Sequence, residues 1–385
     1  MAHDLVAAVA RIGREVARPA ARAVDEAARF PAETIAALKA CGALGAAIPA
    51  ELGGAGLDLA AVAESCTALG QHCASSAMIV AMHHIQVASL VHHRGRTPEI
   101  DRYLRRVAAE QRLIASVTSE VGTGGDMRSS ITAIEEHGER FGLKKQATTV
   151  SYGCHADDLL VTARRHASAS THDQVLVLLL GGDFALTPTG SWDTLGMRGT
   201  CSVPATIEAT GAKWQIVTEP FGDVAAHTMV PVSHVLWASG WLGVATDAFS
   251  IARAKLRSEA RSDVGAVPFL APQLSETGAK LQLLRSEVAA ATGEIARLLA
   301  CGDHAALGSV GAALRMNNLK LSASRLAVEI ATDALSICGI AGYRNDSEYS
   351  VGRHLRDLLS APLMVHNHRL LDTNASLSMV GKWEP

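Results

Sequence analysis

The first third of the chain has the spacing of apolar residues that is typical of packed helices. Residues 1 to about 111 are expected to be helical. Residues 1–30 carry a charged residue every three or four positions, which indicates an amphipathic helix. Pro31 is expected to open one of these helices at Ala32, because proline fits the first turn of a helix. The stretch Leu57–Val91 is an almost unbroken run of apolar residues, so we expect its helices to lie inside a bundle.

Between about Arg112 and Val230 the apolar residues come instead in short runs. Three runs rich in aliphatic and β-branched residues are expected to be strands: Leu159–Thr162, Val175–Leu180 and Trp214–Val217. Clusters of turn-forming residues separate them, with no helical pattern between. Several short strands in succession predict a compact β-sandwich or barrel.

Helical spacing returns near Val232 and continues to the end of the chain. Its clearest example is a seam of apolar residues at spacings of three, four and seven, formed by Leu274, Leu281, Leu284, Val288, Ala291, Ile295 and Leu298. Such a seam predicts long helices that pack against one another, within a chain or between subunits. The pattern therefore predicts a mostly α protein with a central β domain, divided into a helical domain at 1–111, a β domain at 112–230 and a helical bundle at 231–385.

Composition narrows the possible classes of function. Hydrophobic residues make up 48% and charged residues 19% of the 385 residues, which excludes a disordered or collagen-like polymer. The net charge is −3 without a basic stripe, which argues against nucleic-acid binding. Seven scattered cysteines without a C-x-x-C pair argue for a reducing compartment and against a metal site. With neither a signal-peptide pattern nor an uncharged apolar run of about 18 residues, we expect a cytoplasmic protein without a membrane span.

Three glycine-bearing segments carry the candidate chemistry. The first is Ser116–Asp126, in which three glycines follow a run of hydroxyl side chains. Glycines leave backbone N–H groups open to a ligand, because no Cβ stands in the way. The second is Leu195–Thr200, an arginine framed by glycines. The third is Cys338–Tyr343, and an Arg-Asp pair follows it at Arg356 and Asp357.

The order and context of these segments resemble the acyl-CoA dehydrogenase superfamily. Its T-E-P-G-A-G-S-D loop is matched by Ser119–Asp126, and its L-G-M-R-G-T turn is present unchanged at Leu195–Thr200. Its Q-x-x-G-G-x-G-Y segment is matched by Ser336–Tyr343, and its P-E-x-x-G-G loop by Pro49–Gly54. The resemblance spans nearly the whole chain. It implies the fold of that family: an N-terminal helical domain, a middle β-barrel or sandwich, and a C-terminal four-helix bundle.

The resemblance also implies a flavin between the β domain and the C-terminal bundle, FAD in a dehydrogenase or FMN in a monooxygenase. Val117, Thr118 and Ser119 fall where the family contacts the flavin ring. The W-I-T segment, which flanks the flavin in the family, corresponds to the three residues from Thr149 to Ser151. Ser151 keeps the hydroxyl, whereas Thr149 replaces the tryptophan. We expect these five residues to bind the cofactor.

Four glycines are expected to contact the cofactor or the substrate, again by resemblance. Gly124 and Gly125 match the part of the loop that contacts the cofactor or the acyl thioester. Gly339 and Gly342 match the loop that takes the pyrophosphate and adenosine of FAD from a neighbouring subunit, although the second glycine of that motif is Ile340 here. This loop and the apolar seam together imply a homodimer or a homotetramer.

The chain lacks the catalytic glutamate of the family. In its dehydrogenases a glutamate removes the α-proton of the substrate from one of two positions, which correspond here to Val365 and Ser233. Histidines flank both positions, and an imidazole can take up a proton near neutral pH. We therefore predict His366, His368 or His234 as a non-standard base.

Three residues are expected to contact the substrate. Val365 occupies the position of the missing carboxylate, and Gly125 belongs to the glycine loop. His84 lies on a predicted N-terminal helix, from which it could line the ligand cavity.

Three functions remain open on this fold. The first, and the one that we expect, is α,β-dehydrogenation of an acyl thioester, carried by CoA or an acyl-carrier protein, with His or a displaced carboxylate as the base and with an electron-transfer partner. The second is a flavin-dependent monooxygenase that uses O2 and flavin reduced by a reductase. Such enzymes need no α-proton base and often have His and Ser around the flavin, roles that His84, His366, His368 and Ser151 could take. The third is a non-catalytic subunit of a hetero-oligomer, which the two missing glutamates would suit and the retained glycine loops argue against.

Overall fold

The N-terminal part of the chain folds as a layer of helices. The computed structural model describes residues 2–95, 97–262 and 267–380. The helices of this part are α1 (Ala2–Ile12), α2 (Arg18–Glu26), α3 (Ala32–Ala40), α4 (Leu59–Gly70), α5 (Ala74–His92) and α6 (Pro98–Glu110). Pro31 precedes α3 as predicted. At the start of α4, the Asp58 side chain accepts a hydrogen bond from Ala61 N and so satisfies a free backbone donor.

Helix α5 is buried along most of its length, because its residues are small or apolar on nearly all sides. The neighbouring α4 approaches the C-terminal helix α8 (Val230–Ser262) closely enough to exclude side chains. A Cβ on Gly70 would lie 2.3 Å from Gly240 O, and one on Gly243 would lie 2.2 Å from Thr67 O. Only glycine permits this approach, which joins the N-terminal layer directly to the bundle.

The middle part consists of two small sheets that share one hydrophobic core. The strands are β1 (Ile114–Val117), β2 (Glu135–His137), β3 (Arg140–Val150), β4 (Asp158–Arg164), β5 (Gln174–Leu179), β6 (Phe184–Pro188) and β7 (Val203–Ala212). One sheet has the order β1-β4-β5 and the other β2-β3-β7-β6. β1 pairs with β4 in parallel, and the other pairs within the described residues are antiparallel. The predicted strand at 159–162 is confirmed within β4, and the one at 175–180 is confirmed as far as Leu179, where β5 ends.

The prediction of a strand at Trp214–Val217 holds only for its second half, where Ile216 forms an isolated antiparallel bridge with Val177 and Val217 N donates to Leu176 O at 2.9 Å. Lys213–Gln215 forms a short 3-10 turn instead. The side chain of Gln215 explains the turn, because its Oε1 accepts from Ala212 N at 2.5 Å and its Nε2 donates to Leu178 O at 2.8 Å. A local side-chain amide thus takes up backbone groups that a strand would use for pairing.

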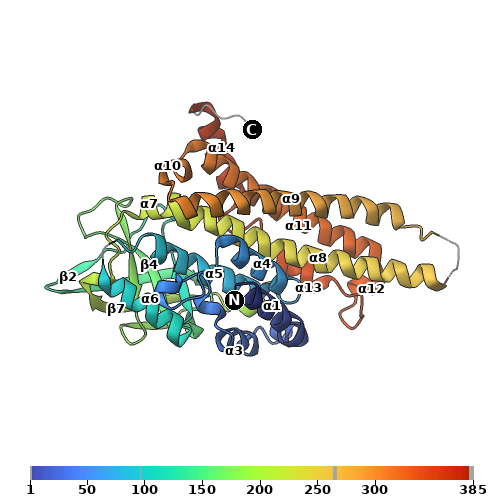
Figure 1. Cartoon of the computed structure of the whole chain (residues 1–385), viewed down its shortest axis with the longest axis horizontal. Helices are drawn as coiled ribbons and strands as arrows, with labels where there is room; N and C mark the ends of the chain where they lie inside the picture. Colours follow the sequence, from blue (N-terminus) through green and yellow to red (C-terminus); the bar gives the residue numbers. More distant parts are fainter. Residues whose placement is uncertain (1, 96, 263–266, 381–385) are drawn as a thin grey trace.

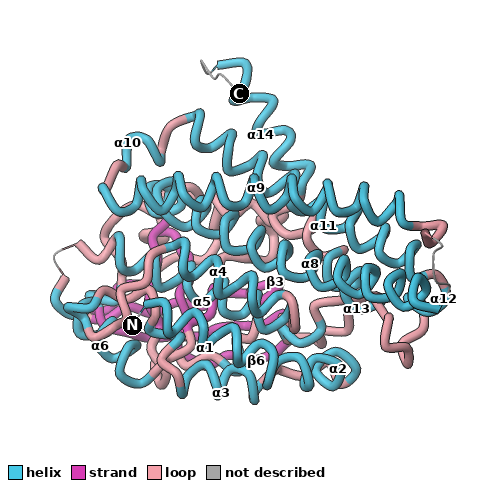
Figure 2. Tube along the Cα trace, turned by 45° about the vertical axis from the view of Figure 1, so that its right-hand side comes forward, coloured by secondary structure: helices cyan, strands magenta, loops and turns pink. Residues whose placement is uncertain are grey.

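Three long helices, α8, α9 (Ala271–Cys301) and α11 (Val310–Cys338), dominate the last part of the chain and lie side by side (Figure 1). The shorter elements are α7 (Phe221–Val224), a π-helical turn (Ala225–Met229), α10 (His304–Leu307), α12 (Ile340–Tyr343), α13 (Gly352–Leu358) and α14 (Asn367–Val380). Figure 2 shows α14 above the long helices, near the C-terminus. The predicted seam is confirmed from Leu281 onward, since α9 buries Leu281, Leu284, Val288, Ala291, Ile295 and Leu298, whereas Leu274 is only half-buried. The order of a helical domain, a β domain and a helical bundle is therefore as expected.

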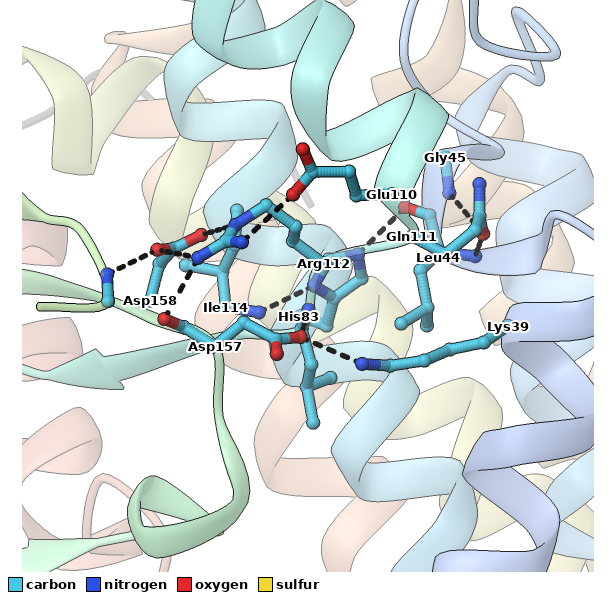
Figure 3. Close-up of polar contacts among 12 residues, drawn as sticks. Lys39, Leu44, Gly45, His83, Glu110, Gln111, Arg112, Ile114, Asp157 and Asp158 are labelled. Carbon is cyan, nitrogen blue, oxygen red and sulfur yellow. Dashed lines mark hydrogen bonds and ion pairs between the residues drawn. The ribbon is translucent and has the colours of Figure 1, made fainter.

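A buried polar network joins the N-terminal helices to the β domain (Figure 3). Nε and Nη2 of Arg112 each lie 2.6 Å from an oxygen of Asp158, a carboxylate with no exposed surface. The neighbouring Asp157 accepts a hydrogen bond from Lys39 Nζ at 2.8 Å. The Arg112–Asp158 pair is the buried one and is held by good geometry rather than by water, whereas the Lys39–Asp157 pair is partly exposed. Together the two pairs connect the start of β4 to α3 and to the end of α6.

His83 makes a second connection between α5 and β1 (Figure 3). Its Nδ1 accepts a hydrogen bond from Ile114 N at 3.1 Å, and its Nε2 lies 2.8 Å from Leu44 O. Burial lowers the pKa of this imidazole to about 4, so it is neutral at ordinary pH. A neutral imidazole has one donor and one acceptor nitrogen, which matches the contacts to Leu44 O and Ile114 N. The strand that leads into the glycine loop is thereby positioned by a helix of the N-terminal domain.

Two helical stretches are long and apolar enough to cross a membrane by length and composition alone, Ala74–His92 and Phe221–Arg261. In the folded chain, 83% and 72% of their most apolar windows are buried inside the protein. Burial of this extent is typical of the core helices of a globular fold.

Candidate active site

The residues predicted to contact the flavin ring lie at the ends of strands β1 and β3. Ser119 donates a hydrogen bond from Oγ to Thr149 O at 2.7 Å and accepts one from Thr149 N at 3.1 Å. Val117 is fully buried at the end of β1, whereas Thr118 beside it is half-buried. The tertiary structure therefore brings together two segments that are about thirty residues apart in the sequence.

Ser151 is held by a chain of hydroxyl groups. It accepts a hydrogen bond from Ser202 Oγ at 2.8 Å, and Ser202 Oγ lies 2.8 Å from Thr200 Oγ1. Thr200 Oγ1 in turn donates to Met197 O at 2.8 Å. The L-G-M-R-G-T turn thus acts here as a support for Ser151, a role that its sequence did not reveal.

The glycine loop needs its glycines for conformational reasons. Gly122, Gly124 and Gly125 have φ angles of +91°, +61° and +82°. Residues with a Cβ seldom adopt this left-handed region. The loop is exposed at all three positions, so its backbone is open to a ligand.

A buried ion pair anchors the start of this loop. Glu120 is 3% exposed and accepts hydrogen bonds from Ser130 Oγ at 2.7 Å and from Thr132 N at 2.6 Å. The Lys145 ammonium lies 3.4 Å from the same carboxylate, and burial lowers the pKa of Lys145 to about 8. Sequence reasoning missed this anchor, because nothing in the sequence shows that the two charges meet inside the β domain.

The segment predicted to carry the position of the family's glutamate lies beside the glycine loop. Val365 and the next residue, His366, precede α14, and His366 and His368 are both exposed with their ring centroids 5.9 Å apart. One residue further, Arg369 donates a hydrogen bond to Gly124 O. The fold therefore brings Val365, His366 and His368 close to the loop of Gly124, although the two imidazoles point into open surface.

His234, the third candidate base, is in a different environment. It is 2% exposed on α8, and its Nδ1 lies 2.9 Å from Met316 O. Burial lowers its pKa to about 4. The adjacent Ser233 is also buried and donates to Met229 O at 2.5 Å within its own helix. Backbone carbonyls thus occupy His234 Nδ1 and the Ser233 hydroxyl, and the lowered pKa of His234 makes its imidazole a weak proton acceptor.

His84, the predicted substrate contact, is buried on α5 with its ring centroid 5.0 Å from that of His83. Burial lowers its pKa, and its Nδ1 has no hydrogen-bond partner among the described residues. An apolar cavity does open between α5 and α8, and it is lined by Ala74, Ala77, Met78, Ala81, Met197, Leu236, Gly240, Trp241, Val244, Asp357 and Leu358. His84 is therefore near this layer of helices but does not line that cavity.

Gly339 and Gly342 lie around α12, at the end of the long helices that is opposite the β domain (Figure 1). Gly339 has a φ of +58°, and a Cβ added to it would meet no atom within 4 Å. A Cβ on Gly342 would instead lie 2.5 Å from Cys338 Cβ. Gly339 is thus open to a ligand, whereas Gly342 serves close packing. Neither lies with the flavin-ring residues of the same chain.

Sequence reasoning also missed a buried lysine. Lys320 on α11 is fully buried, and its Nζ donates a hydrogen bond to Asn367 Oδ1 at 2.6 Å. The signal was present, because Lys320 shares the spacing of the buried residues Met316, Ala323 and Ala327, and lysine is almost never fully buried without a partner. Burial lowers the pKa of Lys320 to about 8.

The arrangement fits a flavin. Thr118 and Thr149 carry hydroxyl groups on a partly exposed face of the β domain, beside Ser119, which is bonded to the Thr149 backbone, and Ser151, which accepts from Ser202. Such groups can bond to the polar edge of an isoalloxazine ring, and the adjacent glycine loop leaves its backbone accessible. Among the residues that the structure describes, no group of His, Cys, Asp and Glu side chains is suited to hold a metal ion.

Known proteins that resemble this chain include a dehydrogenase and FMN-bound structures. Cyclohex-1-ene-1-carbonyl-CoA dehydrogenase of Geobacter metallireducens is 27% identical over 363 residues, which is 92% of this chain and 90% of that protein. The structure of KijD3 in complex with FMN and dTDP-3-amino-2,3,6-trideoxy-4-keto-3-methyl-D-glucose is similar with a TM-score of 0.83 and 25% identity, over 97% of this chain and 93% of that chain. FMN-bound TdsC of Paenibacillus sp. A11-2, a dibenzothiophene monooxygenase, has a TM-score of 0.84 and 17% identity, over 98% and 97%.

Two family models match the chain directly. The acyl-CoA dehydrogenase N-terminal domain matches residues 2–111, and the acyl-CoA dehydrogenase C-terminal domain matches residues 223–364. Together these segments make up more than half of the chain, and they flank the β domain on both sides. The chain belongs to the acyl-CoA dehydrogenase family.

Proposed function

We propose that the chain is a flavin-dependent monooxygenase, which transfers one oxygen atom of O2 to a small organic substrate. Membership of the family makes it a flavin oxidoreductase; the oxygenase reaction is the part that we infer. A reduced flavin supplies two electrons, one oxygen atom goes to the substrate, and the other leaves as water. A separate reductase would deliver the reduced flavin.

One observation carries this proposal: neither of the two glutamate positions has a residue that can replace the glutamate well. Val365 and Ser233 stand at those positions. A general base must reach the α-proton from a desolvated site and have a pKa near the operating pH. The exposed His366 and His368 lack the desolvation, and the buried His234 has a pKa of about 4. Oxygen transfer needs no such base.

Two solved structures with the same fold also support oxygen transfer. TdsC is a dibenzothiophene monooxygenase with FMN, and KijD3 is solved with FMN and a nucleotide-linked sugar. Both share the fold of this chain over almost its entire length. We therefore propose FMN or FAD as the cofactor, held by Thr118, Ser119, Thr149 and Ser151. The open Gly339 at the far end of the long helices supports a homodimer or homotetramer in which it reaches the cofactor of a neighbouring subunit.

The test compares oxygen transfer with dehydrogenation on the same preparation. The holoenzyme is supplied with a flavin reductase, NADH and 18O2, and candidate substrates are analysed by mass spectrometry. In parallel, the oxidised holoenzyme is mixed anaerobically with a panel of acyl-CoA thioesters, and loss of flavin absorbance is followed. We expect label in a product and no anaerobic bleaching. Bleaching by an acyl-CoA without label incorporation would overturn the proposal, and a purified protein that binds no flavin would point to the non-catalytic subunit.

A matched variant sharpens this comparison. Val365→Glu restores a carboxylate at the position that the dehydrogenases use, next to the glycine loop. If the missing base is what prevents dehydrogenation, the variant should gain anaerobic bleaching that the parent protein lacks. Ser233→Glu tests the second position in the same way, although its side chain starts from a buried helix face.

The second candidate is α,β-dehydrogenation of an acyl thioester, with an electron-transfer partner. It is favoured by the match to cyclohex-1-ene-1-carbonyl-CoA dehydrogenase over 92% of this chain. On this alternative, His366 or His368 would close onto the substrate and act as the base. His366→Ala or His368→Ala should then slow acyl-CoA bleaching by about 10²-fold or more, the scale of general-base removal. If both variants bleach at the parent rate, neither histidine is the base.

A further inference from the structure

The turn that leads into α14 is strained. Val365 and His366 have φ angles of +51° and +44°. A positive φ is uncommon for any residue other than glycine, and for a β-branched residue such as valine it is a genuine outlier. Two such residues in succession persist only where the surrounding structure holds them. The turn is closed by Asn367 N, which donates to Pro362 O at 3.0 Å.

Two residues of helix α11 bind the side-chain amide of Asn367, which ends this turn. Lys320 Nζ donates to Asn367 Oδ1 at 2.6 Å, and Asn367 Nδ2 donates to Ser324 Oγ at 3.0 Å. Ser324 Oγ also donates to Leu321 O at 3.0 Å, which orients it. Lys320 and Ser324 have no exposed surface, and Asn367 is 8% exposed. The first residue of α14 is therefore fixed to the interior of the bundle.

A second buried lysine shows what is unusual about this contact. Lys145 is as deeply buried, but the carboxylate of Glu120 lies 3.4 Å from its ammonium. Within the described part of the chain, no carboxylate forms an ion pair with Lys320, and its hydrogen-bond partner is the neutral amide of Asn367. A buried charge without a counter-charge costs free energy of folding. Replacement by an apolar residue would fill the same space at lower cost, so stability alone does not explain this lysine.

The clamp formed by Lys320, Asn367 and Ser324 lies directly behind the candidate active site. Val365 occupies the position from which a glutamate acts in the dehydrogenases of the family. Two residues beyond Asn367, Arg369 donates to Gly124 O of the glycine loop. The strained turn is thus held on one side by α11 and connected on the other side to the glycine loop.

We propose that Lys320 is a positioning residue of the active site: through Asn367, its ammonium holds the strained turn at Val365 and His366 in place beside the flavin. The proposal concerns the geometry of the site. It is independent of whether oxygen transfer or dehydrogenation takes place there, so its test can fail while the proposed function stands.

The experiment uses the flavin-loaded protein and three variants: Lys320→Met, Asn367→Ala and the double variant. Hydrogen exchange measured by mass spectrometry reports the opening of residues 361–370. The rate at which O2 oxidises the photoreduced flavin reports the site and needs no knowledge of the substrate. We expect each single variant to speed exchange of the turn by about tenfold or more, and to change the O2 rate by a similar factor, with flavin still bound. Since Lys320 acts through Asn367, the double variant should show no larger effect than the single ones.

Two further variants complete the design. Lys320→Arg keeps the positive charge and the donor, so it should restore at least part of the slow exchange and of the parent O2 rate. Lys280→Met removes a lysine of the same bundle that pairs with Asp333 at 2.9 Å on the surface of α9, and it should change neither measurement. If Lys320→Met does not fold, Asn367→Ala tests the same contact. Unchanged exchange would overturn the proposal. Faster exchange with an unchanged O2 rate would reduce the clamp to a purely structural role and would also overturn it.

Discussion

Replacing Lys320 by methionine should remove a rise of protein stability with pH. Burial lowers the pKa of Lys320 from an ordinary value of 10.5 to about 8. Between these values the unfolded chain keeps a proton that the folded protein has already released. The unfolded chain then binds more protons, so the free energy of unfolding increases as pH rises through this window.

The magnitude follows from the two pKa values of Lys320. Their difference corresponds to about 3 kcal/mol when the titration is complete, since each pKa unit is worth roughly 1.4 kcal/mol. Between about pH 7.5 and about pH 9.5, the part that is realised is about 2 kcal/mol. Other groups titrate in this range, Lys145 among them, but they are common to the parent protein and the variant. The difference between the two proteins therefore isolates Lys320.

The assay is urea unfolding of the holoenzyme at both pH values, at one ionic strength and with saturating flavin, followed by tryptophan fluorescence. We expect the parent protein to gain about 2 kcal/mol relative to Lys320→Met on going to the higher pH. Lys280→Met is the control, because the hydrogen bond to Asp333 raises the pKa of Lys280 and keeps it charged throughout. A relative gain below about 0.5 kcal/mol would refute the reasoning, since Lys320 would then titrate like an exposed lysine.

Three further substitutions test the packing that positions the site. Gly196→Ala should cost about 3 kcal/mol or more of unfolding free energy or prevent folding, because the new Cβ would lie 2.1 Å from a backbone oxygen of α13; a thermal melt close to that of the parent protein would contradict this. Asp158→Asn should cost about 3–5 kcal/mol in urea unfolding, since it leaves the Arg112 guanidinium without its buried partner. Leu284→Ala, at a position with no exposed surface, should cost about 2–5 kcal/mol in the same assay. Leu283→Ala, beside it but 64% exposed, should stay within about 0.5 kcal/mol, and equal losses at the two positions would disprove the assignment of the seam.

Much of the fold could be predicted from the sequence, because the signals are local. The spacing of Leu281, Leu284 and Val288 depends only on the pitch of a helix, so it placed the buried face of α9 correctly. The ordered glycine motifs indicated the family, since glycine is needed wherever the backbone turns sharply or approaches another chain segment. The same local reasoning failed in the first half of Trp214–Val217, although the apolar residues suited a strand. There the side chain of Gln215 took the backbone hydrogen bonds instead.

The candidate site was only partly predictable for the same reason. The sequence placed Ser119 and Thr149 by their motifs, and they meet in the structure at 2.7 Å. The sequence could not show that His234 would be buried beside Met316 O while His366 stays exposed, because burial depends on which helices pack together.

By itself, the sequence determined the helical and β parts and the glycine motifs that indicate the family, since each depends on residue identity and short-range spacing. Only the tertiary structure decided which charges are buried and which distant residues meet. Lys320 and Asn367 are separated by 46 other residues along the chain, yet their side chains lie 2.6 Å apart. The environment that sets the pKa of that lysine is built by α11 and α14 together, and a pKa depends on the dielectric surroundings and neighbouring groups in space rather than on order along the chain.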